Sequence, residues 1–154
     1  KFREQLPGIA IRTSLIVGYP GETDSIFQQL KNWVEETKFD RLGVFTYSHE
    51  EDTHSFSLKD DVPESVKKQR AKELMETQMQ ISYNLNQQKV GQVFSVLFDK
   101  KEGEYFVGRT EFDSPEVDNE VLVSTQDTYI RLGDFSNIRI IKADYYDLYG
   151  ELVE

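Results

Sequence analysis

Residues 9–23 read IAIRTSLIVGYPGET, a β-branched apolar run that ends in a turn rich in glycine and proline. A near-continuous apolar run of this length is typical of a strand covered on both faces in a parallel α/β sheet. Thr23 or Asp24 then offers an N-cap, and apolar residues recur at helical spacing from Ile26 to Val34. The sequence therefore predicts a strand, a turn and a helix in succession.

A second strand and a long helix are predicted next. Residues 41–47 are typical of a strand, which completes a βαβ unit, and residues 48–62 are polar and acidic and predict a loop. Pro63 stands at the first helical position, and apolar steps of three and four residues predict a helix to about Gln88. Two parallel strands leave sheet edges unpaired, so we expect this part to belong to a larger α/β domain. The alternative is a compact two-layer α/β domain that the barrel completes.

The hydrophobic period changes from helical to two after Gly91. Five short strands are predicted, at residues 93–99, 104–110, 119–124, 137–143 and 146–152. Short strands separated by turn signals favour a small OB-like barrel, because closure removes exposed strand edges. The fold class expected is α/β plus all-β, with one domain in residues 1–87 and a second in residues 88–154.

The composition excludes several kinds of site. The 154 residues include no cysteine, so this chain can form neither a disulfide nor a cysteine-held iron–sulfur cluster. A net charge of −10 argues against non-specific nucleic-acid binding, and no apolar run approaches the ~20 residues of a membrane helix. His49 and His54 lie in a polar loop without further ligands, so we expect neither a metal nor a catalytic role for them.

Two motifs in their order resemble a known family. LIVGYPGET at residues 15–23, followed by GVFTYS at residues 43–48 and a long helix into a barrel, is similar to the methylthiotransferases. These are radical S-adenosylmethionine enzymes with a C-terminal TRAM barrel, and the resemblance covers essentially the whole chain. It implies that residues 1–87 are the last part of a TIM-like radical barrel and that residues 88–154 are a TRAM domain.

The resemblance also implies cofactors, namely S-adenosylmethionine and two [4Fe–4S] clusters in the full-length enzyme. The residues that it places at the adenosylmethionine site are Ile16, Gly18, Pro20, Gly21, Glu22 and Tyr47. The general pattern of radical enzymes is G-x-I-x-G-x-x-E, and here Ser14 replaces the first glycine while Glu22 comes one place late. Because the family's cluster-binding cysteines are absent, we expect no cluster ligand and no catalytic residue in this chain, and no activity from it alone.

Charge bears on the substrate, since the family modifies either adenosine in transfer RNA or an aspartate of a small-subunit ribosomal protein. Residues 88–154 hold seven Lys or Arg and 14 Asp or Glu, a net charge of −7, against −3 for residues 1–87. An acidic barrel repels RNA and attracts a basic protein. The run GRTEFDSPEVD at residues 108–118 resembles the branch that modifies the ribosomal protein. The candidate substrate contacts are Arg109, Glu111, Asp113, Glu116 and Asp118, although Arg109 could instead pair with one of these acids and hold the loop.

The sequence leaves three functions open. The first is a cytoplasmic enzyme that adds a methylthio group to the β-carbon of an aspartate in a basic small-subunit ribosomal protein, which the TRAM domain docks. The second is a transfer-RNA methylthiotransferase, which requires a basic barrel surface. The third is a non-catalytic OB-like binding module.

Tyr145, Tyr146 and Tyr149 could stack on bases, but strand propensity and local acidity favour a place in the barrel core.

Overall fold

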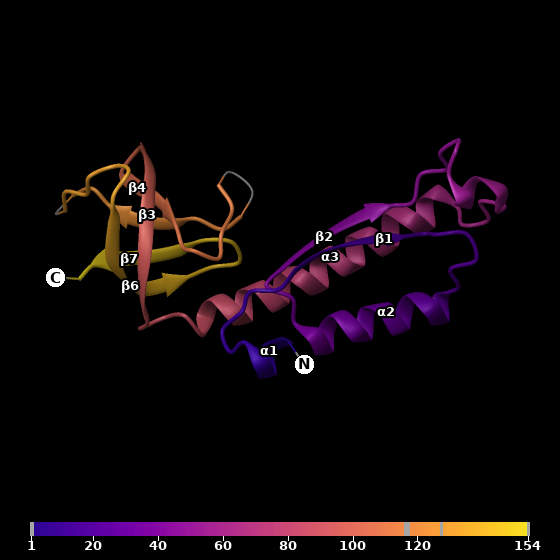
Figure 1. Cartoon of the computed structure of the whole chain (residues 1–154), viewed down its shortest axis with the longest axis horizontal. Helices are drawn as coiled ribbons and strands as arrows, with labels where there is room; N and C mark the ends of the chain where they lie inside the picture. The colour runs from indigo at the N-terminus through magenta and orange to yellow at the C-terminus, as the bar shows by residue number, and fades with distance from the viewer. Residues whose placement is uncertain (1, 116–117, 127, 154) are drawn as a thin grey trace. The chain divides into compact units, whose positions relative to one another are not determined.

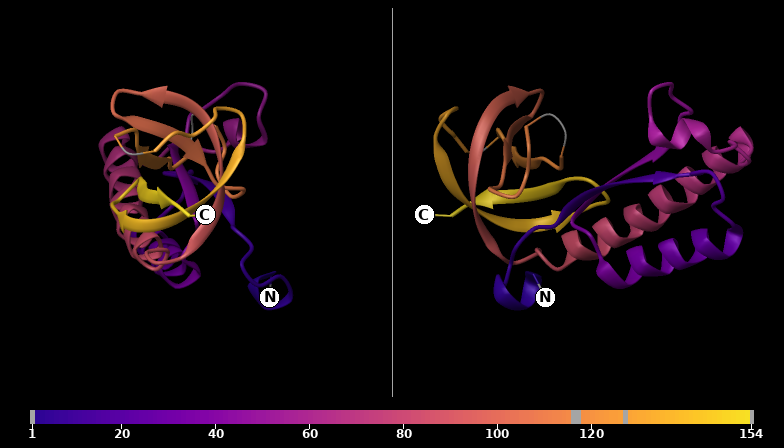
Figure 2. Two further views of the ribbon diagram at one scale, coloured as in Figure 1. Left: turned by 90° about the vertical axis from the view of Figure 1, so that its left-hand side faces the viewer. Right: turned by 45° about the vertical axis from the view of Figure 1, so that its right-hand side comes forward.

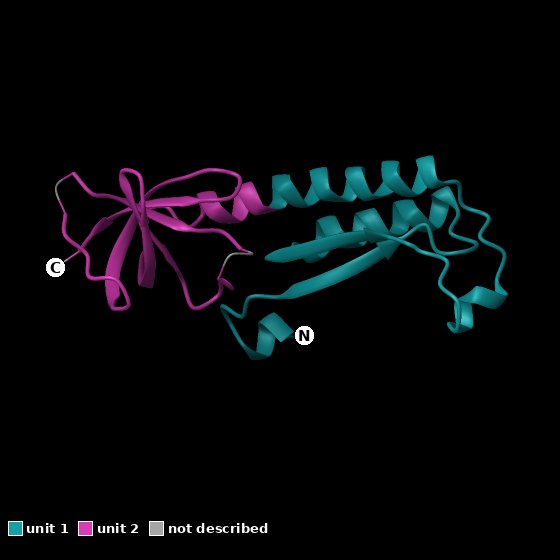
Figure 3. Cartoon of the chain, turned by 90° about the horizontal axis from the view of Figure 1, so that it is seen from above, with its two compact units in different colours: residues 1–81 teal, residues 82–154 magenta. Residues whose placement is uncertain are grey.

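The computed structural model describes residues 2–115, 118–126 and 128–153. The chain divides into two compact units, residues 1–81 and residues 82–154 (Figure 3). The division falls within the long helix α3 (Glu64–Gln87). The sequence predicted this helix, but not a division inside it. The domain boundary between residues 87 and 88 stays a prediction.

The first unit is built on a two-stranded parallel sheet (Figure 1). Its elements are α1 (Phe2–Gln5), β1 (Arg12–Val17), α2 (Asp24–Thr37), β2 (Arg41–Thr46), the 3-10 helix η1 (His54–Ser57) and the first part of α3. The register runs from Arg12 opposite Arg41 to Val17 opposite Thr46. The order of strand, helix, strand and long helix is confirmed, but α1 and η1 were not expected and β1 begins three residues late.

Only one face of this sheet is covered by the described residues. Side chains alternate along β1, so that Arg12, Ser14 and Ile16 are exposed while Val17 is fully buried. Helices α2 and α3 lie on the same side of the sheet in both Figure 1 and Figure 3. The described residues supply a layer on one side only, as expected for two parallel strands with a single crossover helix, although the apolar run itself is typical of a strand covered on both faces.

The inner face of α3 is partly polar. Met75, an apolar residue of this helix, is 44% exposed. The buried positions of α3 in this unit are Lys67, Arg70, Leu74, Gln78 and Ile81. Their spacing of three and four residues is helical, so the predicted periodicity was correct. The buried face differs from the prediction because it includes polar and charged side chains as well as apolar ones.

The second unit is a closed five-stranded barrel (Figure 2), which confirms the predicted fold class. Its strands are β3 (Val93–Glu102), β4 (Tyr105–Arg109), β5 (Val121–Ser124), β6 (Phe135–Ala143) and β7 (Leu148–Leu152). The order around the barrel is β3-β4-β5-β7-β6, and the one parallel pair is β5 with β7. Closure leaves each of these strands with two neighbours, so the barrel has no open edge.

The barrel encloses an apolar core. The residues of this core are Val96, Phe98, Phe106, Val121, Val123, Ile130, Ile138, Ile140, Ala143 and Leu148. Two glycines allow the strands to approach closely, because a Cβ at Gly108 would lie 2.6 Å from the Leu97 carbonyl oxygen and one at Gly150 would lie 2.2 Å from Ile138 Cγ2. Among the described residues, no helix is long and apolar enough to cross a membrane.

Candidate functional site

The turn between β1 and α2 folds back on the side chain of Glu22. The Gly18 N–H donates to Oε1 of Glu22 at 3.0 Å, and the Glu22 N–H donates to the Tyr19 carbonyl oxygen at 2.9 Å. Helix α2 then begins after Thr23, whose hydroxyl oxygen accepts from the Ile26 N–H at 3.3 Å. Of the two N-caps that the sequence offered, the structure uses Thr23.

Gly18 meets two requirements at this turn. Its φ of +77° lies in the left-handed region, which side chains disfavour. A Cβ built on Gly18 would also lie 2.3 Å from Cγ of Lys67, well inside van der Waals contact. Glycine at this position therefore serves both the shape of the turn and the close approach of a side chain from α3.

Lys67 is buried beneath the turn, with 1% of its side chain exposed. Its ammonium nitrogen lies 2.7 Å from Oδ2 of Asp60, 2.9 Å from Oε1 of Glu64 and 3.4 Å from the Tyr47 carbonyl oxygen. Burial lowers the pKa of Lys67, but the hydrogen bonds to Asp60 and Glu64 outweigh it and hold this pKa above its ordinary value. Lys67 is therefore a charged group, and its nitrogen sits 5.2 Å from the centre of the Tyr47 ring.

Arg70, one helical turn further along α3, binds the other side of the turn. Its Nη1 donates to the carbonyl oxygen of Glu22 at 3.0 Å and to Oε1 of Glu22 at 2.8 Å, while Nη2 donates to Oδ1 of Asp24 at 2.7 Å. The Arg70 and Glu22 side chains are 6% and 8% exposed, so this ion pair is buried. Sequence reasoning missed both cations, although their positions on the inward face of the helix were a usable signal.

The residues predicted to bind adenosylmethionine fall into two groups. Gly18, Glu22 and Tyr47 meet around Lys67 and Arg70, and the Tyr47 ring is 7% exposed and stacks edge-on with Tyr19 at 5.3 Å between centroids. Pro20 and Gly21 form the tip of the turn, where the Gly21 N–H donates to Oδ1 of Asp61 at 2.8 Å. Ile16 lies apart, on the open face of the sheet.

The open face has the chemistry to take the flat ring of an adenosyl group. Ile16 and Phe45 occupy opposite positions on β1 and β2, and their side chains are 58% and 60% exposed. An exposed apolar pair at the carboxyl ends of parallel strands fits a ring, since ligands of parallel α/β sheets bind at that end. The assignment of Ile16 to the adenosylmethionine site remains a prediction.

Iron–sulfur clusters do not fit this chain, because it contains no cysteine. Within the part of the chain that the structure describes, no group of three acidic, histidine or cysteine residues could hold a metal ion. His49 instead lies 3.2 Å from the Tyr47 hydroxyl through Nδ1 and packs on Phe56, with ring centroids 4.8 Å apart. His49 is exposed in the loop that follows β2.

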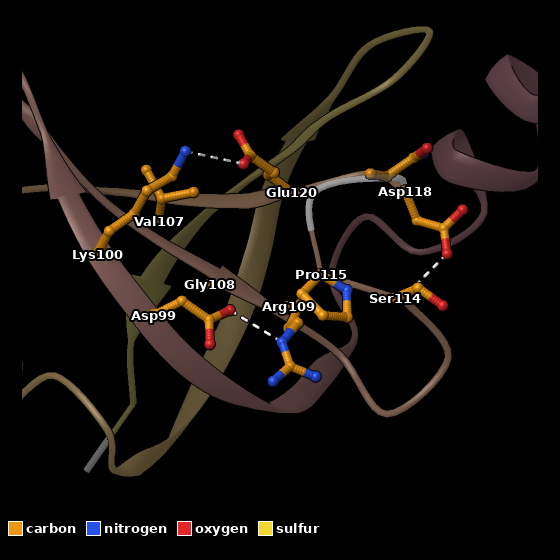
Figure 4. Close-up of a pocket in the computed structure, with 10 residues that line it drawn as sticks. Asp99, Lys100, Val107, Gly108, Arg109, Ser114, Pro115, Asp118 and Glu120 are labelled. Carbon is orange, nitrogen blue, oxygen red and sulfur yellow. Dashed lines mark hydrogen bonds and ion pairs between the residues drawn. The ribbon is translucent and has the colours of Figure 1, made fainter.

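A second candidate site is a cavity of about 270 Å³ on the barrel (Figure 4). Its lining residues are Asp99, Lys100, Val107, Gly108, Arg109, Ser114, Pro115, Asp118, Asn119 and Glu120. Lys100 lies 2.8 Å from Glu102 and 3.4 Å from Glu120. The hydrogen bond between Lys100 and Glu102 raises the pKa of the lysine and lowers the pKa of the glutamate, so both stay charged.

The predicted substrate contacts have different surroundings. Arg109 pairs with Asp99, with 2.9 Å between Nε and Oδ2, as Figure 4 shows, and not with the described acids of its own loop. Asp113 is 6% exposed and accepts from the Thr110 hydroxyl at 2.6 Å, and Oδ2 of Asp118 accepts from the Ser114 N–H at 2.7 Å. Glu111 is exposed, and Glu116 lies outside the described residues.

The three tyrosines near the C-terminus do not share one environment. Tyr149 is partly buried and packs edge-on against Tyr105, and burial followed by the nearby Asp144 raises its pKa. Tyr145 and Tyr146 are 42% and 60% exposed. The expectation that all three belong to the core is therefore wrong for Tyr145 and Tyr146, because the segment that carries them is a turn between β6 and β7.

Comparison with known proteins identifies the barrel and its relatives. Residues 90–153 match the TRAM domain family. The chain is 62% identical to a protein of Flavobacterium johnsoniae and 59% identical to one of Christiangramia forsetii, over 97% and 98% of this chain and 34% of each relative. A protein of Cytophaga hutchinsonii is 55% identical over 99% of this chain and 35% of its own length.

All three relatives carry the name ribosomal protein uS12 methylthiotransferase RimO. The resemblance to the methylthiotransferases, and to the branch that acts on a ribosomal protein, is thereby confirmed. The chain spans about a third of the length of these relatives. Residues 90–153 match the TRAM domain that the family resemblance implied for residues 88–154, and their strand pattern predicted a small barrel.

Proposed function

We propose that this chain, a close relative over nearly all its length of proteins named ribosomal protein uS12 methylthiotransferase RimO, is a segment of an enzyme with that activity. The observation that carries the proposal is an identity of 55–62% over 97–99% of the chain. In the reaction that we propose, a methylthio group is added to the β-carbon of an aspartate in uS12. The activity is that of the complete protein, acting in the cytoplasm, where ribosomes are found.

In this proposal, the open face of the sheet and the turn that follows β1 form part of the adenosylmethionine site. Adenosylmethionine, together with a cluster held elsewhere in the enzyme, supplies the radical that starts the reaction. In this chain, Ile16 and Phe45 would pack on the adenosyl group, because both side chains are exposed and lie side by side across the two strands. Gly18 and Glu22 would hold the turn at the edge of that face.

The barrel would dock the substrate protein by charge. Its net charge of −7 favours a basic partner, and ribosomal proteins are basic because they contact RNA phosphates. Of the candidate contacts, Glu111 is exposed, whereas Asp113 is buried in a hydrogen bond to Thr110. We therefore assign the contact with uS12 first to Glu111, with Asp118 at the rim of the cavity.

A direct binding measurement tests this proposal. The 154-residue chain is titrated with purified uS12 and, separately, with transfer RNA at about 0.15 M salt, where long-range attraction is screened. Binding to uS12 that weakens with added salt, together with no measurable binding to transfer RNA, is the expected result. Tighter binding to transfer RNA would contradict the proposal and favour the RNA-modifying branch.

A matched pair of variants separates local docking from overall charge. Glu111→Lys on the barrel and Glu36→Lys on α2 each change the net charge by the same amount, and both side chains are exposed. We expect Glu111→Lys to weaken binding of uS12 by about threefold, the order of a single exposed ion pair, and Glu36→Lys to leave it unchanged. Equal effects of the two variants would show that no specific acidic contact exists at residue 111.

A further inference from the structure

We propose that Lys67 and Arg70 are positioning residues, two buried cations on α3 that set the shape of the turn from Gly18 to Glu22 and, through it, the affinity for adenosylmethionine. The statement about affinity rests on the proposed function, while the statement about the turn stands on contacts within the first unit. Neither residue belongs to the motif by which the chain resembles its family.

The two cations bind backbone in the segments that follow the carboxyl ends of both strands. Lys67 lies 3.4 Å from the carbonyl oxygen of Tyr47, one residue beyond β2, and Arg70 lies 3.0 Å from that of Glu22. The carboxyl ends of parallel strands are where α/β sheets bind their ligands. Burial of a charge costs free energy that a leucine at the same helix position would not incur, so a structural role alone would be served better by an apolar residue.

Arg70 acts on the turn through the carboxylate of Glu22. Oε1 of Glu22 accepts from Nη1 of Arg70 at 2.8 Å and from the Gly18 N–H at 3.0 Å, so one oxygen connects the helix to the first residue of the turn. The guanidinium spans this oxygen, the Glu22 carbonyl and Asp24 at once. A lysine ammonium keeps the charge but cannot reproduce this planar set of donors.

Lys67 acts on the turn through its methylene groups as well as its charge. Its Cγ lies 2.3 Å from the position that a Cβ on Gly18 would occupy, and its Cβ and Cδ lie 3.0 Å from it. The methylene groups of Lys67 therefore pack directly against the backbone of Gly18. Asp60 and Glu64 hold the ammonium group in place at 2.7 and 2.9 Å.

Amide hydrogen exchange in the 154-residue chain tests the positioning of the turn without any cofactor. The variants are Arg70→Lys and Lys67→Met, and the control is Lys72→Met, the same substitution on the same helix at a side chain that is 70% exposed. We expect the Gly18 amide to exchange about tenfold faster in Arg70→Lys, because it loses an acceptor held by a charge-assisted bond. It should also exchange faster in Lys67→Met, because Asp60 and Glu64 no longer hold the side chain against Gly18, and wild-type exchange in this variant would remove Lys67 from the proposal. The amides of β1 and β2 should keep wild-type protection, which shows that the unit remains folded.

The second measurement uses the complete enzyme loaded with its clusters. Arg70→Lys should raise the KM for adenosylmethionine by about tenfold with little change in kcat, and Lys72→Met should change neither. Wild-type exchange at Gly18 in Arg70→Lys would overturn the proposal, and an unchanged KM would overturn its link to the cofactor. If the wild-type enzyme does not bind adenosylmethionine, the proposed function fails, while the exchange result still decides the role of the two cations in the turn.

Discussion

The barrel and the α/β unit bury different kinds of interior. The barrel closes five strands around an apolar core, and its strands have no unpaired edge. The α/β unit has two strands, and its buried residues include Lys67, Arg70 and Gln78 beside the apolar ones. Burial of apolar area stabilises the barrel, whereas the shape of the α/β unit beyond the carboxyl ends of its strands depends on specific hydrogen bonds.

This difference in interior bears on how each unit keeps its shape. A closed barrel is stable in one shape and can present a charged outer surface whose residues vary freely, because the fold does not rest on them. A sheet edge that orients a ligand needs backbone groups at fixed positions, and buried charge-assisted hydrogen bonds fix them within short distances. Variants in the two units test this contrast.

The largest effect is expected for Phe98→Ala in the barrel. Phe98 is fully buried, and its truncation should lower the free energy of unfolding of the barrel by about 4 kcal/mol through lost burial and a cavity. Trp33 on α2 is the single tryptophan, so its fluorescence reports on the α/β unit alone. Urea unfolding followed by far-UV circular dichroism should show an earlier barrel transition while the Trp33 transition stays in place.

The matched control for this variant is Phe135→Ala, at a phenylalanine of the same barrel that is 70% exposed. It should change the barrel's stability by less than about 0.5 kcal/mol. A parallel shift of the Trp33 transition in Phe98→Ala would show that the two units unfold together, and the contrast between them would then lose its basis.

The second effect is expected for Arg70→Met, which leaves the buried Glu22 carboxylate without its cation. Breaking one partner of a buried ion pair should destabilise the α/β unit by about 3 kcal/mol, read from the Trp33 transition. The comparison variant is Arg139→Met on the barrel, where Arg139 and Glu151 are both about half exposed and lie 3.5 Å apart. That exposed pair should contribute less than about 1 kcal/mol, and equal losses would contradict the contrast.

The third effect compares two strand glycines. Gly150→Ala places a Cβ 2.2 Å from Ile138 Cγ2 within the barrel, and overpacking should cost about 2 kcal/mol. Gly43→Ala on β2 meets Phe45 at 3.5 Å, an ordinary contact on the open face, so the α/β unit should keep its stability. Thermal unfolding of both variants measures the difference. If Gly150→Ala is as stable as the wild type, the barrel adjusts its strand spacing to the added methyl group.

The smallest effect concerns pH and the turn between β6 and β7. Burial raises the pKa of Asp144, but hydrogen bonds from the Asp147 and Tyr146 N–H groups and the Tyr149 hydroxyl outweigh it and lower this pKa. A carboxyl with a lowered folded-state pKa stabilises the fold above its unfolded pKa of about 3.9, and this stability is lost as pH falls through the folded pKa. Asp144→Asn should therefore destabilise the barrel by about 1 kcal/mol at neutral pH and flatten its acid unfolding.

The pKa of Asp147, in the same turn, shifts in the opposite direction to that of Asp144, because burial raises it. The stability that Asp147 contributes to the barrel is present below its unfolded-state pKa and is lost as pH rises through its folded-state pKa. Asp147→Asn keeps an acceptor for the Glu120 N–H and should leave the barrel as stable or more stable at neutral pH. If the two substitutions shift the midpoint of acid unfolding in the same direction, the opposite pKa shifts assigned to Asp144 and Asp147 are contradicted.

Much of this protein was accessible from sequence because its signals are local. The β-branched run that ends at Gly18, the helical spacing after Thr23 and the period of two after Gly91 each arise from neighbouring residues, and each predicted the correct element. The motifs at residues 15–23 and 43–48 pointed to the methylthiotransferases. Net charge, which is a sum over residues, pointed to a basic protein partner without any knowledge of the fold.

The tertiary structure decided which side chains meet. Lys67 and Arg70 lie more than 40 positions along the chain from the turn they contact, and a helical pattern alone does not reveal that a cation will be buried against a carboxylate from another element. The pairing of Arg109 with Asp99 across β3 and β4 depends in the same way on strand register. Sequence therefore determined the elements and the charge, whereas partners distant in the chain follow from packing, which no local period encodes.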